Sequence, residues 1–324
     1  MELSPSQNIV VFRLPNQKQI QLFCSGEGKS KFVFAPFLRD AKKFSLNGEL
    51  VNIEETELQG IFSSIVLPNS SNKLSTGDSA YKELVDLAKN KISSSLLDKV
   101  VLAGKKWVKL EKEILKVYTS LLENSPSAFV YLASIEGKVM VGASPELLLE
   151  RNANQLQTVA LGGTETRGVY SEKEEIEHQQ IKDYIESILK ERMYNFTSHE
   201  TSSVQASTVA HLKTPYSIEA KSLEDDLDLI SYLHPTSAIC GLPYQEALNF
   251  IKENEGFNRN FYAGYLGAID ENNNFNLFVN LRCAELYQEG AMLYAGAGIN
   301  AMSSAEDEWL EINNKMQTIA QCLK

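Results

Sequence analysis

Residues 128–145 read AFVYLASIEGKVMVGASP, and this stretch decides the fold class. Two apolar runs flank Glu136, Gly137 and Lys138, a short turn of the kind that joins neighbouring antiparallel strands. The stretch therefore predicts a β-hairpin within an antiparallel sheet.

Similar runs occur on both sides of this hairpin. Towards the N-terminus they are NIVVFRL (8–14), QIQLFCSG (19–26) and KFVFAPF (31–37), and towards the C-terminus FYAGYLGAID (261–270), FNLFVNLRCAEL (275–286) and GAMLYAGAGI (290–299). We read each run as one strand and expect helices near 80–94, 111–123, 172–195, 243–253 and 304–323. Because strands outnumber parallel crossovers, the sequence predicts an α+β protein built on antiparallel sheets.

The composition excludes several classes of protein. Lys and Arg number 31 and Asp and Glu 42, which gives a net charge of −11 and argues against binding to nucleic acid or an anionic membrane. No signal peptide and no run of 18 apolar residues is present, so no spanning helix is expected. The four cysteines are far apart and are typical of a reduced, cytoplasmic protein.

Lys99 stands directly before four apolar residues in DKVVLAGKK (98–106). Such a run predicts a buried strand, and buried strands seldom begin with an ammonium group. Two interpretations stay open at this point: Lys99 marks the end of the strand, or it is held in a dry cleft to move protons.

Two predicted helices place carboxylates near an apolar stripe. Glu177 lies four residues before Ile181, the first residue of the stripe of its helix, although a first helical turn is often acidic and exposed. In the last helix, Glu311 and Lys315 form an i, i+4 pair, which on a surface stabilises a helix by about 0.3–0.5 kcal/mol. Upstream of that helix, the small residues Gly296, Ala297 and Gly298 would let backbone N–H groups approach an anion. Together these residues suggest a site for a divalent metal and an acidic substrate.

Glu146 and the histidines carry a weaker signal. Glu146 follows Pro145 at the end of a predicted strand, where it occupies a defined place or simply faces solvent. His211 and His234 are more typical of packed histidines than of ligands, and none of the four histidines has zinc spacing.

Ten motifs between Lys99 and Lys315 resemble the chorismate-utilising enzymes, a family similar to anthranilate synthase component I, and most closely its isochorismate synthases. In order they are KVVLAGK, GASPELL, ALGGTETRG, KEEIEH, HLKTP, LHPTSAICGLP, RNFYAG, NLRCAEL, YAGAGI and EDEWLEINNK. The resemblance implies one catalytic domain over 1–324, in which two antiparallel sheets pack together with helices outside. Residues 1–95 would be a shortened N-terminal portion and 96–324 the core that carries the motifs.

The resemblance also implies roles for single residues. Lys99 matches the general base that activates water for attack at C2 of chorismate, and Glu146 the general acid that protonates the departing C4 hydroxyl. Glu177 and Glu311 match the carboxylates that hold Mg²⁺. The implied substrate contacts are His211, Tyr262, Arg282, Gly296, Ala297, Gly298, Lys315, Gly163 and Thr164, with Arg259 as a further pocket residue.

Some positions depart from the family pattern. Gly104 replaces an arginine, whose charge Lys105 or Lys106 would supply, while Gly162, Ser237 and Cys240 replace alanine, proline and glycine. The absence of a lysine at Gly162 removes the covalent nucleophile of the aminodeoxychorismate synthases.

The sequence thus predicts a reversible, Mg²⁺-dependent conversion of chorismate to isochorismate by a cytoplasmic monomer without a glutaminase subunit. The product would feed menaquinone or siderophore biosynthesis. The alternatives are a salicylate synthase, which also eliminates pyruvate, and a degenerate chorismate-binding protein without turnover.

Overall fold

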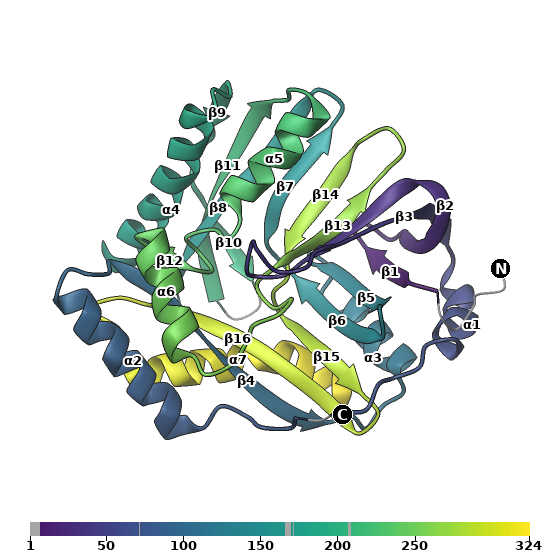
Figure 1. Ribbon diagram of the computed structural model, residues 1–324, viewed down its shortest axis with the longest axis horizontal. Helices are drawn as coiled ribbons and strands as arrows, with labels where there is room; N and C mark the ends of the chain where they lie inside the picture. The colour runs from purple at the N-terminus through teal and green to yellow at the C-terminus, as the bar shows by residue number, and fades with distance from the viewer. Residues whose placement is uncertain (1–6, 71, 166–169, 171, 207–208) are drawn as a thin grey trace.

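The structure is a computed structural model that describes residues 7–70, 72–165, 170, 172–206 and 209–324 (Figure 1). Its strands are β1 (Ile9–Arg13), β2 (Ile20–Ala35), β3 (Phe44–Ile53), β4 (Lys99–Lys109), β5 (Phe129–Ile135), β6 (Lys138–Ser144), β7 (Leu147–Asn152), β8 (Gln155–Glu165), β9 (Phe196–Ser198), β10 (Ser202–Ala206), β11 (Val209–Glu219), β12 (Gly241–Leu242), β13 (Tyr265–Ile269), β14 (Phe275–Val279), β15 (Cys283–Tyr287) and β16 (Gly290–Ile299). The helices are η1 (Glu55–Glu57, a 3₁₀ turn), α1 (Leu58–Ser63), α2 (Asp78–Ser93), α3 (Ile114–Asn124), α4 (Glu172–Glu191), α5 (Leu223–Leu233), α6 (Tyr244–Asn254) and α7 (Ala305–Leu323).

Over the described residues the strands join into one 16-stranded sheet. Its order is β10-β11-β8-β7-β14-β13-β2-β1-β5-β6-β15-β16-β4-β12, with β3 beside β2 and β9 beside β11. Every strand pair in this part of the chain is antiparallel. The predicted α+β class with antiparallel pairing is therefore confirmed, and the two expected sheets are continuous with each other.

The hairpin that decided the fold class is formed as predicted. β5 pairs with β6 from Phe129 with Ser144 to Ile135 with Lys138. Glu136 and Gly137 both have positive φ, 50° and 74°, as a tight turn between twisted strands requires.

The prediction of a single strand over 275–286 is wrong. β14 ends at Val279 and β15 begins at Cys283, because Arg282 has a φ of 47°, which no extended strand can hold. β14 pairs with β13 and β7, whereas β15 pairs with β6 and β16. The junction 280–282 therefore connects the part of the sheet that contains β7, β14 and β13 to the part that contains β6, β15 and β16.

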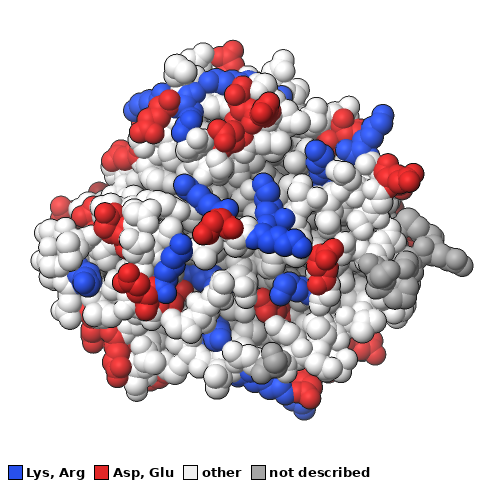
Figure 2. Space-filling view, in the orientation of Figure 1, with Lys and Arg blue, Asp and Glu red and all other residues white. Residues whose placement is uncertain are grey.

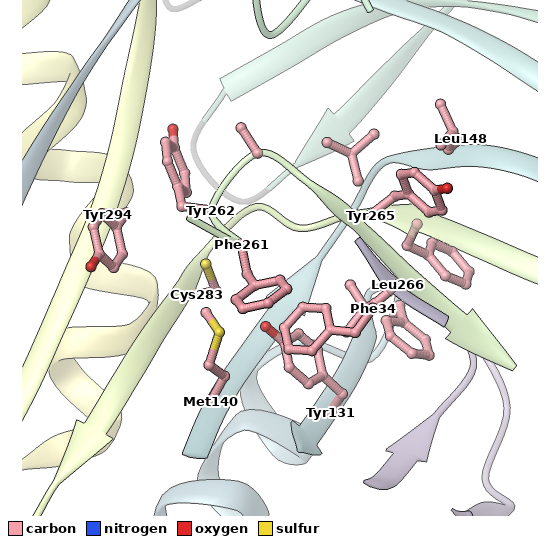
Figure 3. Packing of buried hydrophobic residues seen from close by; sticks show 14 of the residues in the cluster. Phe34, Tyr131, Met140, Leu148, Phe261, Tyr262, Tyr265, Leu266, Cys283 and Tyr294 are labelled. Atoms are coloured by element: carbon pink, nitrogen blue, oxygen red, sulfur yellow. The ribbon is translucent and has the colours of Figure 1, made fainter. Parts of the chain in front are cut away.

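The N-terminal strands lie in the middle of the sheet rather than at an edge. β1 pairs with β2 and β5, and β2 also pairs with β13. Their inward side chains continue an aromatic cluster, in which the Phe12 ring lies 5.5 Å from the Phe129 ring. Figure 3 shows the part of this core where Phe34, Tyr131 and Phe261 meet. The division of the chain into domains stays a prediction.

The helices pack on strands near both ends of the sheet. α4 packs on β8 and β11, α7 on β16 and β4, and α2 on α7. α6 contacts β4 and α5 contacts β7. The apolar stripes of α4 and α7 explain their packing. Ile181 and Ile185 on α4 are buried, as are Ile312 and Met316 on α7.

Figure 2 shows Lys and Arg side chains interspersed with Asp and Glu side chains on the face it presents. Within the described residues, no helix combines the length and apolar composition needed to cross a membrane. The four cysteines are free and buried.

Candidate active site

A cavity of about 1070 Å³, including its opening to solvent, lies between the two ends of the sheet. β4 and β16 wall one side, β8 and β11 another, and α4 and α7 contribute acidic side chains. The residues that line it are Val101, Pro145, Glu146, Leu161, Gly162, Glu174, Glu177, Ile181, His211, Ala238, Ile239, Tyr262, Ala263, Leu281, Arg282, Ala295, Gly296, Gly298, Glu308, Glu311 and Lys315.

Lys99 lies at the edge of this cavity in an ion pair. It is the first residue of β4, its side chain is only 5% exposed, and its Nζ is 2.5 Å from Glu177 Oε1. Gly298 makes room for the pair, because a Cβ at that position would lie 2.9 Å from Lys99 Cε. The structure thus brings the predicted base next to one predicted metal carboxylate.

Glu146 is held by the backbone of a neighbouring strand. Its carbonyl accepts a hydrogen bond of 2.9 Å from Val279 N, and the Ser144 hydroxyl donates to the Val279 carbonyl. Burial raises the pKa of the Glu146 carboxyl to about 7, against the opposing effect of Lys99, Lys315 and Arg282. The Glu146 side chain lines the cavity but is otherwise surrounded by protein. Near neutral pH this carboxyl can therefore keep or release a proton.

Three groups, Lys315 on α7, Arg282 and Tyr262, form a cationic and phenolic wall of the cavity. Lys315 Nζ lies 2.5 Å from Glu311 Oε1 and donates a 2.9 Å hydrogen bond to the Gly296 carbonyl. Arg282 remains a cation although burial lowers its pKa. The Tyr262 ring stacks on Tyr294 with centroids 5.4 Å apart. This wall suits a carboxylate ligand with an unsaturated ring.

His211 lines the cavity from β11 as a neutral imidazole. Burial, followed by the charges of Lys315 and Arg282, lowers its pKa to about 4. It can therefore donate or accept a hydrogen bond but carries no charge at neutral pH.

Comparisons with known proteins identify the family of this chain. The family model described as chorismate binding enzyme matches residues 45–324. This chain belongs to the chorismate-binding enzymes.

Several named relatives are isochorismate synthases. The chain is 34% identical over 215 residues to isochorismate synthase EntC of Escherichia coli K12, an alignment that covers 61% of this chain and 54% of EntC. It is 32% identical over 257 residues to the vibriobactin-specific isochorismate synthase of Vibrio cholerae serotype O1, covering 74% of this chain and 65% of that protein. The chain thus spans between half and two thirds of the length of these relatives.

The fold is also that of a solved isochorismate synthase. The menaquinone-specific enzyme MenF from Escherichia coli superposes with a TM-score of 0.83 at 20% identity, over 99% of this chain and 90% of that structure.

Only some of the remaining predicted substrate contacts line the cavity. Gly296 and Gly298 line the cavity, whereas Ala297 between them belongs to the core on the other face of β16. Gly163 has a φ of 69°, and a Cβ there would lie 2.6 Å from the Glu174 carbonyl, so the position needs glycine for backbone reasons. The backbone of Thr164 pairs with His211, and its side chain lies outside the described residues, as do residues 166–168 of the ALGGTETRG motif.

Arg259 lies behind the wall of the cavity. It forms an ion pair with Glu255, in which Nε is 2.8 Å from Oε2, and donates hydrogen bonds to the carbonyls of Val101 and Ile239. Val101 and Ile239 line the cavity, so Arg259 supports the wall from behind.

Of the four departures from the family pattern, those at Gly104 and Gly162 have a structural explanation. A Cβ at Gly104 would lie 2.7 Å from Ile312 Cδ1, and one at Gly162 would collide with Ile181 Cδ1. The nearby lysines make contacts elsewhere, Lys105 over the Phe257 ring and Lys106 with Asn313. Ser237 and Cys240 are buried, and nothing in the structure explains why these residues replace proline and glycine.

Sequence reasoning missed two acidic residues of the cavity, Glu174 and Glu308. Each stands three residues before a predicted metal carboxylate, Glu177 or Glu311, and three residues bring a side chain back to the same helix face. The repeated E-x-x-E spacing in both helices was the signal available. Glu308 is only 4% exposed, so its burial also requires compensation.

The donor set of the two helices fits a magnesium ion. Carboxylate oxygens are the ligands that Mg²⁺ prefers, and it takes one or two of them together with water and substrate. Among the described residues no group of three or more His, Cys, Asp or Glu is close enough to hold a metal ion alone. A cation here would therefore need ligands beyond the protein.

The raised pKa of Glu146 predicts a specific pH dependence of stability. The folded protein keeps a proton on Glu146 up to about pH 7, whereas the ordinary pKa of an exposed glutamate is 4.5. Between these values the folded state binds more protons, so its free energy of unfolding falls as pH rises, by at most about 1.4 kcal/mol per pH unit. We expect Glu146→Gln to remove this component in denaturant titrations from pH 5 to 7.

The matched control is Glu191→Gln, at an exposed position at the end of α4. This variant should keep the wild-type slope. An unchanged slope in Glu146→Gln would show that Glu146 is ionised throughout this range.

Proposed function

We propose that this enzyme interconverts chorismate and isochorismate with Mg²⁺. The observation that carries the proposal is a single cavity that combines a carboxyl of raised pKa, Glu146, with the Lys99–Glu177 ion pair and two cations, Arg282 and Lys315. Chorismate is a dicarboxylate with a hydroxyl to be replaced, so it needs cations for binding and an acid and a base for the exchange.

In the proposed reaction Lys99, as the free amine, takes a proton from water, and the water oxygen bonds to C2. The ring double bond shifts as the C4–O bond breaks, and Glu146 gives its proton to the departing hydroxyl, which leaves as water. Lys99 ends as an ammonium and Glu146 as a carboxylate, so a proton must return from one to the other before the next turnover. The ion pair of Lys99 with Glu177 must open before Lys99 can serve as the base.

Glu177 and Glu311 are the residues that would hold Mg²⁺, with Glu174 and Glu308 beside them. The ion would supply positive charge for a substrate carboxylate. Arg282 and Lys315 would bind the carboxylates of the substrate, and Tyr262 and His211 would contact its ring and hydroxyl groups. Positioning and electrostatics would therefore provide most of the rate enhancement.

We further propose that the enzyme acts in the cytoplasm as a monomer. It would need no glutaminase subunit, because the proposed nucleophile is water. The isochorismate would feed menaquinone or siderophore biosynthesis. The named relatives do not favour a salicylate synthase, which remains an outcome of the first experiment.

That experiment is a product analysis of purified protein with chorismate and Mg²⁺, with EDTA as the control. We expect isochorismate without pyruvate, and none of it in EDTA. Salicylate with an equal amount of pyruvate would identify a salicylate synthase, and unchanged chorismate would contradict an enzymatic role.

Replacing the predicted base should separate chemistry from binding. Lys99→Ala is expected to abolish isochorismate formation, a loss of at least about 100-fold in kcat, because no other group is predicted to activate the water. Chorismate binding, measured by calorimetry with Mg²⁺, should change little. Lys106→Ala, on an exposed side chain of the same strand, should remain active. Turnover near the wild-type rate in Lys99→Ala would exclude Lys99 as the base.

Replacing a predicted metal carboxylate should change the metal requirement. Glu311→Gln removes one anionic ligand and should raise the Mg²⁺ concentration for half-maximal rate by about tenfold or more. Glu306→Gln is the control, since Glu306 is exposed on the same helix and pairs with Lys82. An equal Mg²⁺ requirement in both variants would return Glu311 to a structural ion pair with Lys315.

A further inference from the structure

The junction between β14 and β15 contains a fully buried amide, Asn280, that no step of the proposed reaction uses. Its side-chain Nδ2 donates a 2.8 Å hydrogen bond to the Phe261 carbonyl, and its Oδ1 accepts a 2.6 Å hydrogen bond from the Tyr131 hydroxyl. One side chain therefore links β5, the segment 259–264 and the junction itself. Figure 3 shows Tyr131, Phe261 and Cys283 gathered in this part of the core.

The backbone of Asn280 ties the same segments together. Its N–H donates to the Gly264 carbonyl at 2.7 Å, and its carbonyl accepts from Ala263 N at 2.9 Å. Together with the side-chain bonds, these backbone bonds hold the junction 280–282 against the segment 259–264. If the two segments separated, each buried polar group would lose its hydrogen-bond partner.

Each of the crossing segments presents residues to the cavity. Tyr262 follows Phe261, and Arg282 lies two residues after Asn280. Arg282 and Ala263 have φ values of 47° and 57°, conformations that are unfavourable in residues other than glycine and persist where the surroundings impose them. The bonds of Asn280 are part of these surroundings, together with the 3.0 Å hydrogen bond from Ala143 N to the Arg282 carbonyl.

We propose that Asn280, oriented by the Tyr131 hydroxyl, is a positioning residue that fixes Tyr262 and Arg282 for binding of a carboxylate ligand. The identity of that ligand as chorismate rests on the proposed function. The positioning role itself depends only on the contacts of Asn280. Arg282 would bind a carboxylate of the substrate, which takes no part in the bonds made and broken, so its displacement should weaken binding of the substrate and transition state equally.

Tyr131→Phe tests this role by removing one oxygen atom from the core. We expect KM for chorismate to rise about three- to tenfold, the effect of one buried hydrogen bond, with kcat within about twofold of wild type. Asn280→Ala removes both side-chain bonds and should raise KM further.

Tyr118→Phe is the matched control. Tyr118 is also a fully buried tyrosine, but it lies on α3, and its hydroxyl has no hydrogen-bond partner among the described residues. Its replacement should leave both KM and kcat near wild type. The proposal is wrong if Tyr131→Phe leaves KM within twofold, if it lowers kcat instead, or if Tyr118→Phe raises KM as much.

Hydrogen exchange separates this proposal from the proposed function. If wild-type protein does not convert chorismate, the proposed function fails, and exchange at the amides of Ala263 and Asn280 decides the positioning role. Exchange there should be faster in Tyr131→Phe than in wild type or Tyr118→Phe. Equal exchange in the three proteins would overturn it.

Discussion

The constraint on which this site depends is the crowding of several carboxylates, one buried and three half-buried, at one place. α4 and α7 bring Glu174, Glu177, Glu308 and Glu311 to a single cavity, and carboxylates removed from water need opposite charges or hydrogen bonds. Lys99 and Lys315 each pair with one of them, from β4 and from α7 itself. The two lysines therefore have a structural role as well as their proposed chemical ones.

The backbone around the cavity is fixed by polar groups that do not face it. The Ser144 hydroxyl holds the strand beside Glu146, Arg259 joins β4 to the segment before β12, and Asn280 joins the two segments that carry Tyr262 and Arg282. Such buried networks are costly when incomplete and rigid when satisfied. They explain how residues from distant parts of the chain keep a defined geometry without being in contact with each other.

Much of the fold and part of the site could be predicted from the sequence. The Glu136–Lys138 turn, the stripe beginning at Ile181 and the run after Lys99 are local patterns, and they specified a hairpin, α4 and β4 correctly. The break at Arg282 could not be predicted, because both halves of 275–286 are good strand sequence and tertiary contacts impose the left-handed residue. Similarly, motif matching selected Glu177 and Glu311 but overlooked Glu174 and Glu308, since helical spacing shows which face a residue shares and not how far a cavity extends along it. The role of Arg259 behind the wall depends on the packing of α6 against β4, which no local pattern records.

The central position of β1 and β2 has a consequence for how the chain folds. Ala35 pairs with Tyr265, and Ile9 with Ser134, so the middle of the sheet joins residues that are far apart along the chain. Closing such long loops is slow, because their entropy is lost before the contacts that reward it can form. Residues 31–35 of β2 can complete their pairing only when β13 is available, and an exposed strand edge is where strands of separate chains can join. Aggregation during refolding should therefore depend on the rate at which β13 reaches β2.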